Sequence, residues 1–243
     1  MKCKGCGEEK KLIKAHIIPK SFYMNLRADG NHLNVIHNLK PGRKMTSNIG
    51  DYDQSILCKE CDSIFQKSDQ YAKELLIDRF SSFKELKNRG TLVGWDIGKM
   101  DFHLLKHFFL SLLWRASITT RPFFKRVNLG KHEDKVKKII WGECTDSNIY
   151  TIVLSKFISK DDTTIEKTIL DPDFHKINGL NYYRFYLGGY TAWIKVDKRR
   201  SQGKFAEFEL SNSQTIVVAR HFDRSKEKSI LSQSMLQHMK YNK

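Results

Sequence analysis

In the first part of the chain, apolar residues recur at helical spacing in three separate stretches. The first stretch predicts a helix that begins near Asp62 and buries one face against the rest of the protein. Its apolar stripe consists of Ile64, Phe65, Tyr71, Ala72, Leu75, Leu76 and Phe80. Residues 99–118 predict a second helix that is almost entirely buried, and residues 131–143 predict a shorter, more charged third helix.

From residue 148 onward the pattern changes to short segments of β-branched and aromatic residues bounded by Gly, Asn and Asp. Such segments are typical of strands, so the sequence predicts a β-rich domain. The predicted strands cover residues 150–154, 182–187, 190–196, 205–210 and 215–219. The tail, residues 224–240, has an uneven amphipathic pattern that predicts a helix docked on the body of the protein or on a partner.

These patterns together predict an α+β fold in four parts. Residues 1–95 form a metal-stapled N-terminal module with a long polar loop at residues 25–55, and residues 96–147 form a helical middle. Residues 148–223 form the β-rich domain, and residues 224–243 form the helical tail. The chain has only four prolines, so composition separates these parts more clearly than linkers do.

The charge balance points to a polyanionic partner. The chain has 43 Lys and Arg residues against 27 Asp and Glu residues, a formal net charge of +16, and the excess is spread over both halves. Nucleic acid is the partner expected for such a surface, and a lysine-rich surface that only keeps the protein in solution is the alternative. The N-terminus lacks the apolar core of a signal peptide, and the most apolar stretch, residues 102–113, is too short to span a bilayer. We therefore expect a cytoplasmic protein.

Four of the five cysteines form two Cys-x-x-Cys pairs, Cys3 with Cys6 and Cys58 with Cys61. Two such turns can supply the four thiolates of a closed tetrahedral site, so the spacing predicts structural Zn²⁺, with a redox or chance arrangement as the alternative. The ion would stabilise a long intervening segment that is too polar to fold alone. The fifth cysteine, Cys144, is interpreted as a lone buried thiol.

The segments beside the cysteines read Ala-His-Ile-Ile-Pro at 15–19 and Leu-Cys-Lys-Glu-Cys-Asp at 57–62. Over residues 3–80, a third of the chain, this order resembles the HNH, or ββα-metal, endonuclease family. The resemblance implies that His16 is the general base and that Asp62, at the start of a helix, is a metal ligand. Alternatively, His16 is a core residue and Asp62 only caps its helix.

The sequence departs from the family pattern at three positions. Ala15 stands where the family usually has a metal ligand, Asp53 stands at the position of the family's Asn, and Asp62 stands where His or Asn is common. Asp53 can still orient the histidine or help to hold the ion, and Asp69 returns to nearly the same helix face as Asp62. A carboxylate-rich set of this kind predicts a weakly bound Mg²⁺ or Mn²⁺ as the catalytic ion.

Two further features suggest contact with phosphate. Arg115, at the end of the apolar second helix, must meet either a carboxylate or a phosphate if it is buried. A turn after the predicted strand 190–196 presents several basic side chains that suit a phosphate backbone. The candidates for nucleic-acid binding are therefore Arg115, Lys198, Arg199, Arg200 and Lys204.

The leading functional expectation is a metal-dependent nuclease that hydrolyses phosphodiester bonds in nucleic acid. The resemblance implies a setting in bacterial or phage defence or restriction, with an ATPase partner as in Septu-like or retron systems. Two alternatives stay open. One is a zinc-dependent nucleic-acid-binding or adaptor protein without activity, which Ala15 favours, and the other is a toxin-like RNase that cuts tRNA.

Overall fold

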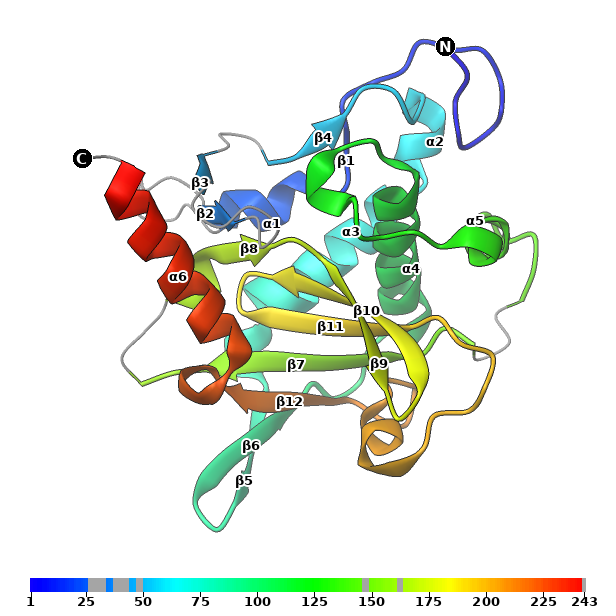
Figure 1. The fold of residues 1–243 in the computed structure, drawn as a ribbon. Helices are drawn as coiled ribbons and strands as arrows, with labels where there is room; N and C mark the ends of the chain where they lie inside the picture. The colour runs from blue at the N-terminus through cyan, green and yellow to red at the C-terminus, as the bar shows by residue number, and fades with distance from the viewer. Residues whose placement is uncertain (26–33, 37–43, 47–49, 146–148, 161–163, 242–243) are drawn as a thin grey trace.

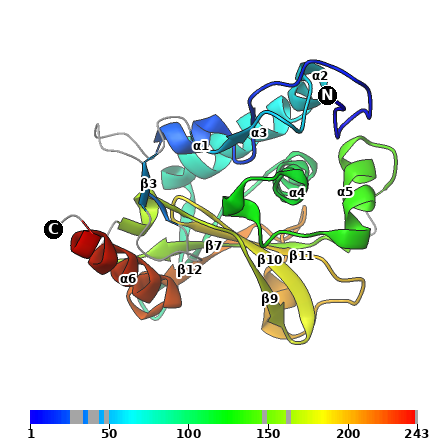
Figure 2. The ribbon, with the colours of Figure 1, turned by 45° about the horizontal axis from the view of Figure 1, so that its top comes forward.

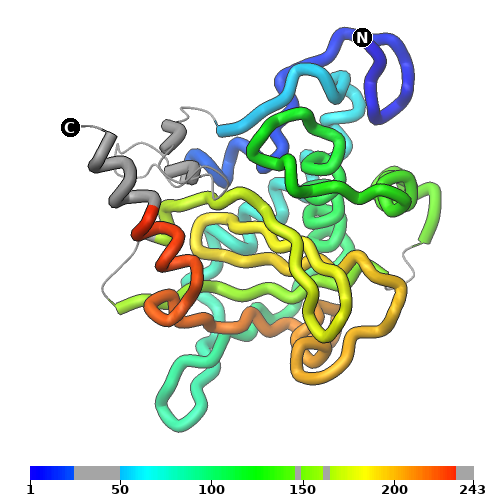
Figure 3. Tube along the Cα trace, viewed as in Figure 1, coloured from blue at the N-terminus to red at the C-terminus, as the bar shows by residue number. Residues whose placement is uncertain are grey.

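The structure is a computed structural model that describes residues 1–25, 34–36, 44–46, 50–145, 149–160 and 164–241 (Figure 1). It is a mixed α+β fold, as the sequence predicts, built on one seven-stranded sheet. Most of the predicted polar loop at residues 25–55 lies outside the described residues. The Cα trace places the N-terminal segment at the opposite end of the molecule from the hairpin formed by residues 84–96 (Figure 3).

The large sheet has the strand order β5-β6-β12-β7-β11-β10-β9. Neighbouring strands are antiparallel except β12 and β7, which are parallel. A two-residue turn at Gly188 and Gly189, both with positive φ, joins β10 to β11, which is the conformation that favours glycine in tight hairpins. In sheet order the strands are β5 (Lys84–Asn88), β6 (Thr91–Asp96), β12 (Ile216–His221), β7 (Ile152–Ile158), β11 (Tyr190–Lys195), β10 (Leu180–Leu187) and β9 (Asp173–Ile177).

The β structure differs from the sequence-based prediction in several places. The sequence pattern did not indicate strands β5, β6 and β9 of the large sheet. Strand β6 pairs with β5 on one side and with β12 on the other, so the boundary predicted between residues 95 and 96 falls inside β6. The predicted strand at 205–210 is wrong, because most of this segment forms the 3₁₀ helix η6 (Gly203–Phe208). Phe205 of η6 packs edge-on against Tyr182 and Trp193 of the sheet, which explains its strand-like apolar pattern.

Figure 2 shows α1 (Lys20–Asn25), α3 (Gln66–Lys73), α4 (Phe102–Ile118) and α5 (Glu133–Ile140) on one side of the large sheet. The side chain of Asp101 caps α4 by accepting a hydrogen bond from the Leu104 N–H at 3.0 Å. The side chains of α4 are buried along most of its length, and it contacts α3, α5 and β11. One continuous apolar core includes residues from Cys3 to Val217, so the N-terminal region and the sheet share it.

Most of the remaining elements are short. Strands β1 (Ala15–His16) and β4 (Tyr52–Asp53) form a two-stranded ladder, and a small separate sheet contains β3, β2 and β8. Its strands are β3 (Lys44–Thr46), β2 (Asn34–Ile36) and β8 (Thr168–Leu170). The other helices are α2 (Lys59–Ser63), η1 (Glu74–Asp78), η2 (Phe80–Ser82), η3 (Pro122–Phe124), η4 (Gly130–His132), η5 (Thr164–Lys167), η7 (Phe222–Arg224) and α6 (Lys226–Tyr241).

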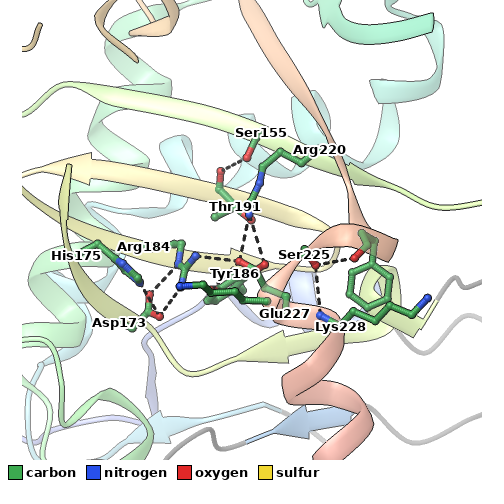
Figure 4. Close-up of polar contacts among 12 residues, drawn as sticks. Ser155, Asp173, His175, Arg184, Tyr186, Thr191, Arg220, Ser225, Glu227 and Lys228 are labelled. Carbon is green, nitrogen blue, oxygen red and sulfur yellow. Dashed lines mark hydrogen bonds and ion pairs between the residues drawn. The ribbon is translucent and has the colours of Figure 1, made fainter. Parts of the chain in front are cut away.

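Helix α6 is held to the sheet by a buried carboxylate. Glu227 is 1% exposed and accepts hydrogen bonds from Arg184 Nη1 at 2.9 Å, Tyr186 Oη at 3.2 Å and Arg220 Nη2 at 3.3 Å. Figure 4 shows these side chains pointing toward Glu227, and Arg184 also pairs with Asp173. Burial alone would raise the pKa of Glu227, but the charges of Arg220 and Arg184 outweigh it and lower that pKa.

We expect a Glu227→Gln substitution to loosen α6 and to lower the free energy of unfolding by about 1–3 kcal/mol, because Arg220 loses its carboxylate partner and Arg184 keeps only Asp173. A lowered pKa in the folded state means that the wild-type contribution is complete above the ordinary carboxyl value of 4.5 and is lost as the pH falls below it. Hydrogen exchange of α6 and urea unfolding at neutral and acidic pH measure both effects. An Asp223→Asn control, at an exposed pair with Lys228, should change little, and equal effects of the two variants would contradict the expectation.

Candidate functional site

The two Cys-x-x-Cys pairs meet in space. The sulfur atoms of Cys3, Cys6, Cys58 and Cys61 all lie within 4.8 Å of one another, and all but Cys6 are buried. Four thiolates around a tetrahedral zinc ion would be separated by about 3.8 Å, given Zn–S bonds of about 2.3 Å. The four cysteines are therefore close enough to bind a metal ion, as the sequence predicts.

The local backbone explains how these sulfurs approach each other. The N–H of Gly7, at φ +79°, donates to the Cys3 carbonyl at 2.8 Å, which closes the first turn. A Cβ at Gly5 would lie 2.6 Å from the sulfur of Cys61, so only glycine allows this close packing. The second pair begins at the N-terminus of α2, where the Cys58 N–H donates to the Cys3 sulfur at 3.3 Å.

The thiol chemistry also suits a cation. Burial alone would raise the pKa of Cys3, but backbone N–H donors of Cys58, Cys6 and Gly5 outweigh it and lower the pKa to about 7. Burial raises the pKa values of Cys58 and Cys61, and the neighbouring sulfurs raise that of Cys61 further. A bound divalent cation would offset the cost of placing these thiolates together.

The histidine of the Ala-His-Ile-Ile-Pro segment lies on β1. In the β1–β4 ladder Ala15 pairs with Asp53, and His16 pairs with Tyr52. Ala15 is fully buried, whereas His16 is half-buried with its ring 5.9 Å from that of Tyr52. The strand therefore directs the two neighbouring side chains into different environments, with the methyl group of Ala15 in the core.

Asp53, predicted to orient His16 or to help hold an ion, is engaged elsewhere. Its Oδ1 accepts from the N–H and hydroxyl of Ser55 at 2.8 and 2.6 Å, and its Oδ2 accepts from the Thr119 hydroxyl at 2.6 Å. The N–H of Thr120 donates to the same Oδ2 at 3.1 Å. Burial works against ionisation here, but these donors outweigh it and lower the pKa of Asp53 to about 2. The carboxylate joins β4 to the residues that follow α4.

Arg115 is 2% exposed and lies between α3 and β1. Its Nη2 donates to Asp69 Oδ1 at 2.9 Å and its Nη1 to Asp69 Oδ2 at 3.1 Å, a bidentate ion pair. The same Nη1 donates to the main-chain carbonyl of His16 at 3.1 Å. The sequence left either a carboxylate or a phosphate as the partner of Arg115. In the structure the partner is the carboxylate of Asp69, so the guanidinium makes an internal ion pair.

Asp62 and Asp69 belong to the same electrostatic environment. Burial raises the pKa of both carboxyl groups, and the charge of Arg115 opposes that rise in each case. The charge of Asp69 raises the pKa of Asp62 further, so the two carboxylates lie within electrostatic reach of each other. Both oxygens of Asp69 are held by Arg115, whereas Asp62 is half-buried on α2.

His107, which the sequence reasoning did not select, lies next to this group. One ring nitrogen of His107 is 2.8 Å from the Ser68 hydroxyl, and the other is 3.1 Å from the Ile140 carbonyl. Burial lowers the pKa of His107, which favours the neutral ring. The four-residue steps from His107 to Ser111 and Arg115 place three polar groups along one side of an apolar helix, and that spacing was the available signal.

The carboxylates predicted for a second, catalytic ion do not gather into a ligand set. Asp53 and Asp69 are occupied by protein donors, as described above. Among the residues that the structure describes, the four cysteines form the only group of three or more His, Cys, Asp or Glu side chains with closely spaced ligand atoms. His16 and Asp62 alone do not fit the oxygen-rich shell of Mg²⁺ or Mn²⁺.

The four basic residues predicted for the loop, Lys198, Arg199, Arg200 and Lys204, are all exposed, but one of them is held by protein acceptors. Arg199 is tied down, because it donates to Asp197 Oδ1 at 2.9 Å, Asp197 Oδ2 at 2.7 Å and the Gly179 carbonyl at 2.7 Å. Lys198, Arg200 and Lys204 are exposed. The exposed side chains thus remain candidates for contact with phosphate.

Comparisons of this chain with protein-family models, curated proteins and solved structures found no match. None of the helices in the described ranges is long and apolar enough to cross a membrane.

Proposed function

We propose that this protein is a nuclease of the HNH type that hydrolyses phosphodiester bonds in nucleic acid, with a structural zinc ion in the four-cysteine site. The observation that carries the proposal is that Arg115 links the strand of His16 to the helix of Asp69, within electrostatic reach of Asp62. Asp62 directly follows Cys61 of the four-cysteine cluster, and this order of residues is the one that the HNH resemblance implies.

In this proposal the imidazole of His16 accepts a proton from the attacking water, which makes the oxygen a better nucleophile toward phosphorus. Arg115 acts as a positioning residue, because its hydrogen bond to the His16 carbonyl fixes β1 while its side chain stays buried. Of the two carboxylates predicted as ligands of the catalytic ion, Asp69 is held in an ion pair with Arg115, and Asp62 is not. The second ion is assigned no step, since the surrounding residues do not form its ligand set.

A substrate that is itself a polyanion suits the net charge of +16. As the resemblance implies, we extend the proposal to a role in bacterial or phage defence or restriction, with an ATPase as the protein partner. Reconstitution with such an ATPase would test that part separately from the cleavage chemistry.

A second candidate function is binding of nucleic acid without cleavage. The observations that favour it are the buried methyl group of Ala15 at a position where the family places a ligand, and the engaged oxygens of Asp53 and Asp69. Such a protein would keep the metal site and the basic surface and would serve as an adaptor.

The deciding experiment incubates the protein with duplex DNA, single-stranded DNA and total tRNA, each with Mg²⁺, Mn²⁺ or a chelator. We expect cleavage by the wild type and a loss of about 10²–10⁴-fold in His16→Ala, the usual contribution of a general base. His221→Ala, at an exposed histidine on the end of β12, is the matched control and should cut at the wild-type rate.

Cleavage of tRNA alone would assign the protein to the toxin-like RNases. If the wild type and His16→Ala bind nucleic acid equally and neither cuts any of the three substrates, the adaptor function replaces the nuclease. Equal cleavage by the wild type and His16→Ala would remove His16 from the mechanism.

A further inference from the structure

Strand β5 lies at one of the two edges of the large sheet. It stands first in the strand order, and among the strands that the structure describes β6 is the one that pairs with it. Figure 1 shows the β5–β6 hairpin projecting from the body of the molecule. Every residue of β5 except Leu86 is exposed. An edge strand in this position can offer its outer N–H and C=O groups to another strand.

The irregular residue of the hairpin lies in β6 rather than in β5. Leu86 pairs with Gly94, and the next residue of β5 pairs with Leu92. Val93 is therefore an extra residue on β6, and β5 itself stays regular along its length. The partner of Leu86 on β6 is a glycine, so this half-buried side chain has no side chain directly opposite it in the hairpin.

The charges along β5 are self-complementary. Glu85 and Lys87 lie on the same face of the strand, where their side chains form an exposed ion pair at 2.9 Å. In an antiparallel pair of two β5 strands centred on Leu86, Glu85 of each chain stands directly opposite Lys87 of the other. Residues in such positions have Cβ atoms about 5 Å apart, so opposite charges attract there and like charges repel. Lys84 then faces Asn88, and this register brings no like charges together.

The other edge of the sheet, β9, lacks this arrangement. An antiparallel pair of β9 strands centred on His175 would place Phe174 opposite Lys176, without opposite charges facing each other. The carboxylate of Asp173 is already engaged, because it pairs with Arg184. Of the two sheet edges, charge complementarity therefore favours β5 as the one that fits a second copy of this chain.

We propose that the protein forms a two-fold homodimer in which the β5 strands of two copies pair antiparallel about Leu86 and join the two large sheets into one. Such a contact buries less area than a standard interface, so we expect a dissociation constant on the order of 10 μM. Repulsion between two chains of net charge +16 is largely screened beyond about 8 Å at physiological ionic strength, so the close pairs decide the contact. The N-terminal segment lies at the opposite end of the molecule, so the dimer leaves both four-cysteine clusters uncovered (Figure 3).

The test is sedimentation equilibrium of the full-length protein from about 1 to 200 μM, a range that brackets the expected dissociation constant. Glu85→Lys and Lys87→Glu should each weaken the dimer by about tenfold or more, because like charges then face each other at two places. An equimolar mixture of the two variants should dimerise again, since a strand with two lysines then faces a strand with two glutamates. The double variant Glu85→Lys/Lys87→Glu should also form the homodimer.

Lys176→Glu is the matched control, because it makes the same change of charge as Lys87→Glu at an exposed lysine on the opposite edge of the sheet. It should dimerise like the wild type. Recovery in the mixture separates the contact from a folding defect, since each variant is the same molecule alone and in the mixture.

A wild type that stays monomeric over the whole range would overturn the proposal, and so would a dimer that Glu85→Lys and Lys87→Glu form as tightly as the wild type. Loss of the dimer in Lys176→Glu alone would move the contact to β9. Loss in both β5 variants without recovery in the mixture or in the double variant would show that the opposed charges do not hold the dimer. None of these outcomes depends on whether the protein cleaves nucleic acid.

Discussion

Replacing Cys58 with serine is expected to abolish stoichiometric zinc binding and to destabilise the whole chain by several kcal/mol. Cys58 is fully buried, its N–H donates to the Cys3 sulfur, and its backbone pairs with Leu12. Structural zinc sites contribute roughly 10–16 kcal/mol of apparent binding free energy at neutral pH, and a serine ligand would forfeit much of it. Because the core is continuous from this site to the sheet, the loss should reach beyond the first residues.

Metal analysis of the purified protein and thermal unfolding with and without a chelator measure this prediction. Cys144→Ser, at the half-buried cysteine outside the cluster, is the matched control and should keep both the metal and the wild-type melting temperature. The wild type treated with a chelator should melt like Cys58→Ser. Full zinc content in Cys58→Ser, or a melting temperature insensitive to chelation, would rule out a structural ion at this site.

The four-cysteine cluster was the feature most accessible from sequence. The turn of a Cys-x-x-Cys pair brings its two thiolates close together by itself, so two such pairs in one chain already predict a common ion. The contact that brings the pairs together was not accessible, because the fit of Gly5 against Cys61 depends on the packing of two distant turns. The sequence thus predicted the ligands, whereas the close packing that admits only glycine required the structure.

Helices and central strands followed from periodicity, but the edge of the sheet did not. Strands β7, β10 and β11 are apolar along most of their length because both faces are buried, and such runs are easy to recognise. The edge strand β5 is largely exposed and rich in charged residues, so its sequence resembles a loop. Strands β5 and β6 form a local hairpin, but β6 pairs with β12 between residues as distant as Asp96 and Ile216, and periodicity does not encode that pairing.

In the candidate site, too, the local motifs predicted the element on which a residue lies, but not its contacts with residues distant in the sequence. The positions of His16 on a strand and of Asp62 on a helix could be anticipated from their motifs. Whether a carboxylate is available for an ion depends on donors supplied from elsewhere, here Thr119 for Asp53 and Arg115 for Asp69. These donors come from the last turn of α4 and from the residue that follows the helix. The sequence near the motifs gives no indication that they will contact Asp53 and Asp69.

Replacing Arg115 with methionine is expected to lower the free energy of unfolding by about 3–5 kcal/mol at neutral pH, the usual cost of leaving a buried charge without its partner. Asp69, whose side chain is only 18% exposed, would then lose both of its guanidinium donors. Urea unfolding of the wild type and the variant measures the change. Arg121→Met, at the more exposed pair with Asp51, is the matched control and should cost no more than about 1 kcal/mol.

The pH dependence distinguishes a lost ion pair from lost packing. Burial already raises the pKa values of Asp62 and Asp69, and removal of the opposing Arg115 charge should raise them further. A folded-state pKa above the unfolded value means that the folded protein binds the proton more tightly. The loss of free energy of unfolding in Arg115→Met should therefore shrink as the pH falls through that value.

The double variant Arg115→Met/Asp69→Leu should recover much of the loss at neutral pH, because no buried charge remains. A deficit that stays constant with pH and is not recovered by the double variant would assign the role of Arg115 to packing alone. In that case its hydrogen bond to the His16 carbonyl would be the only remaining link between Arg115 and the proposed chemistry.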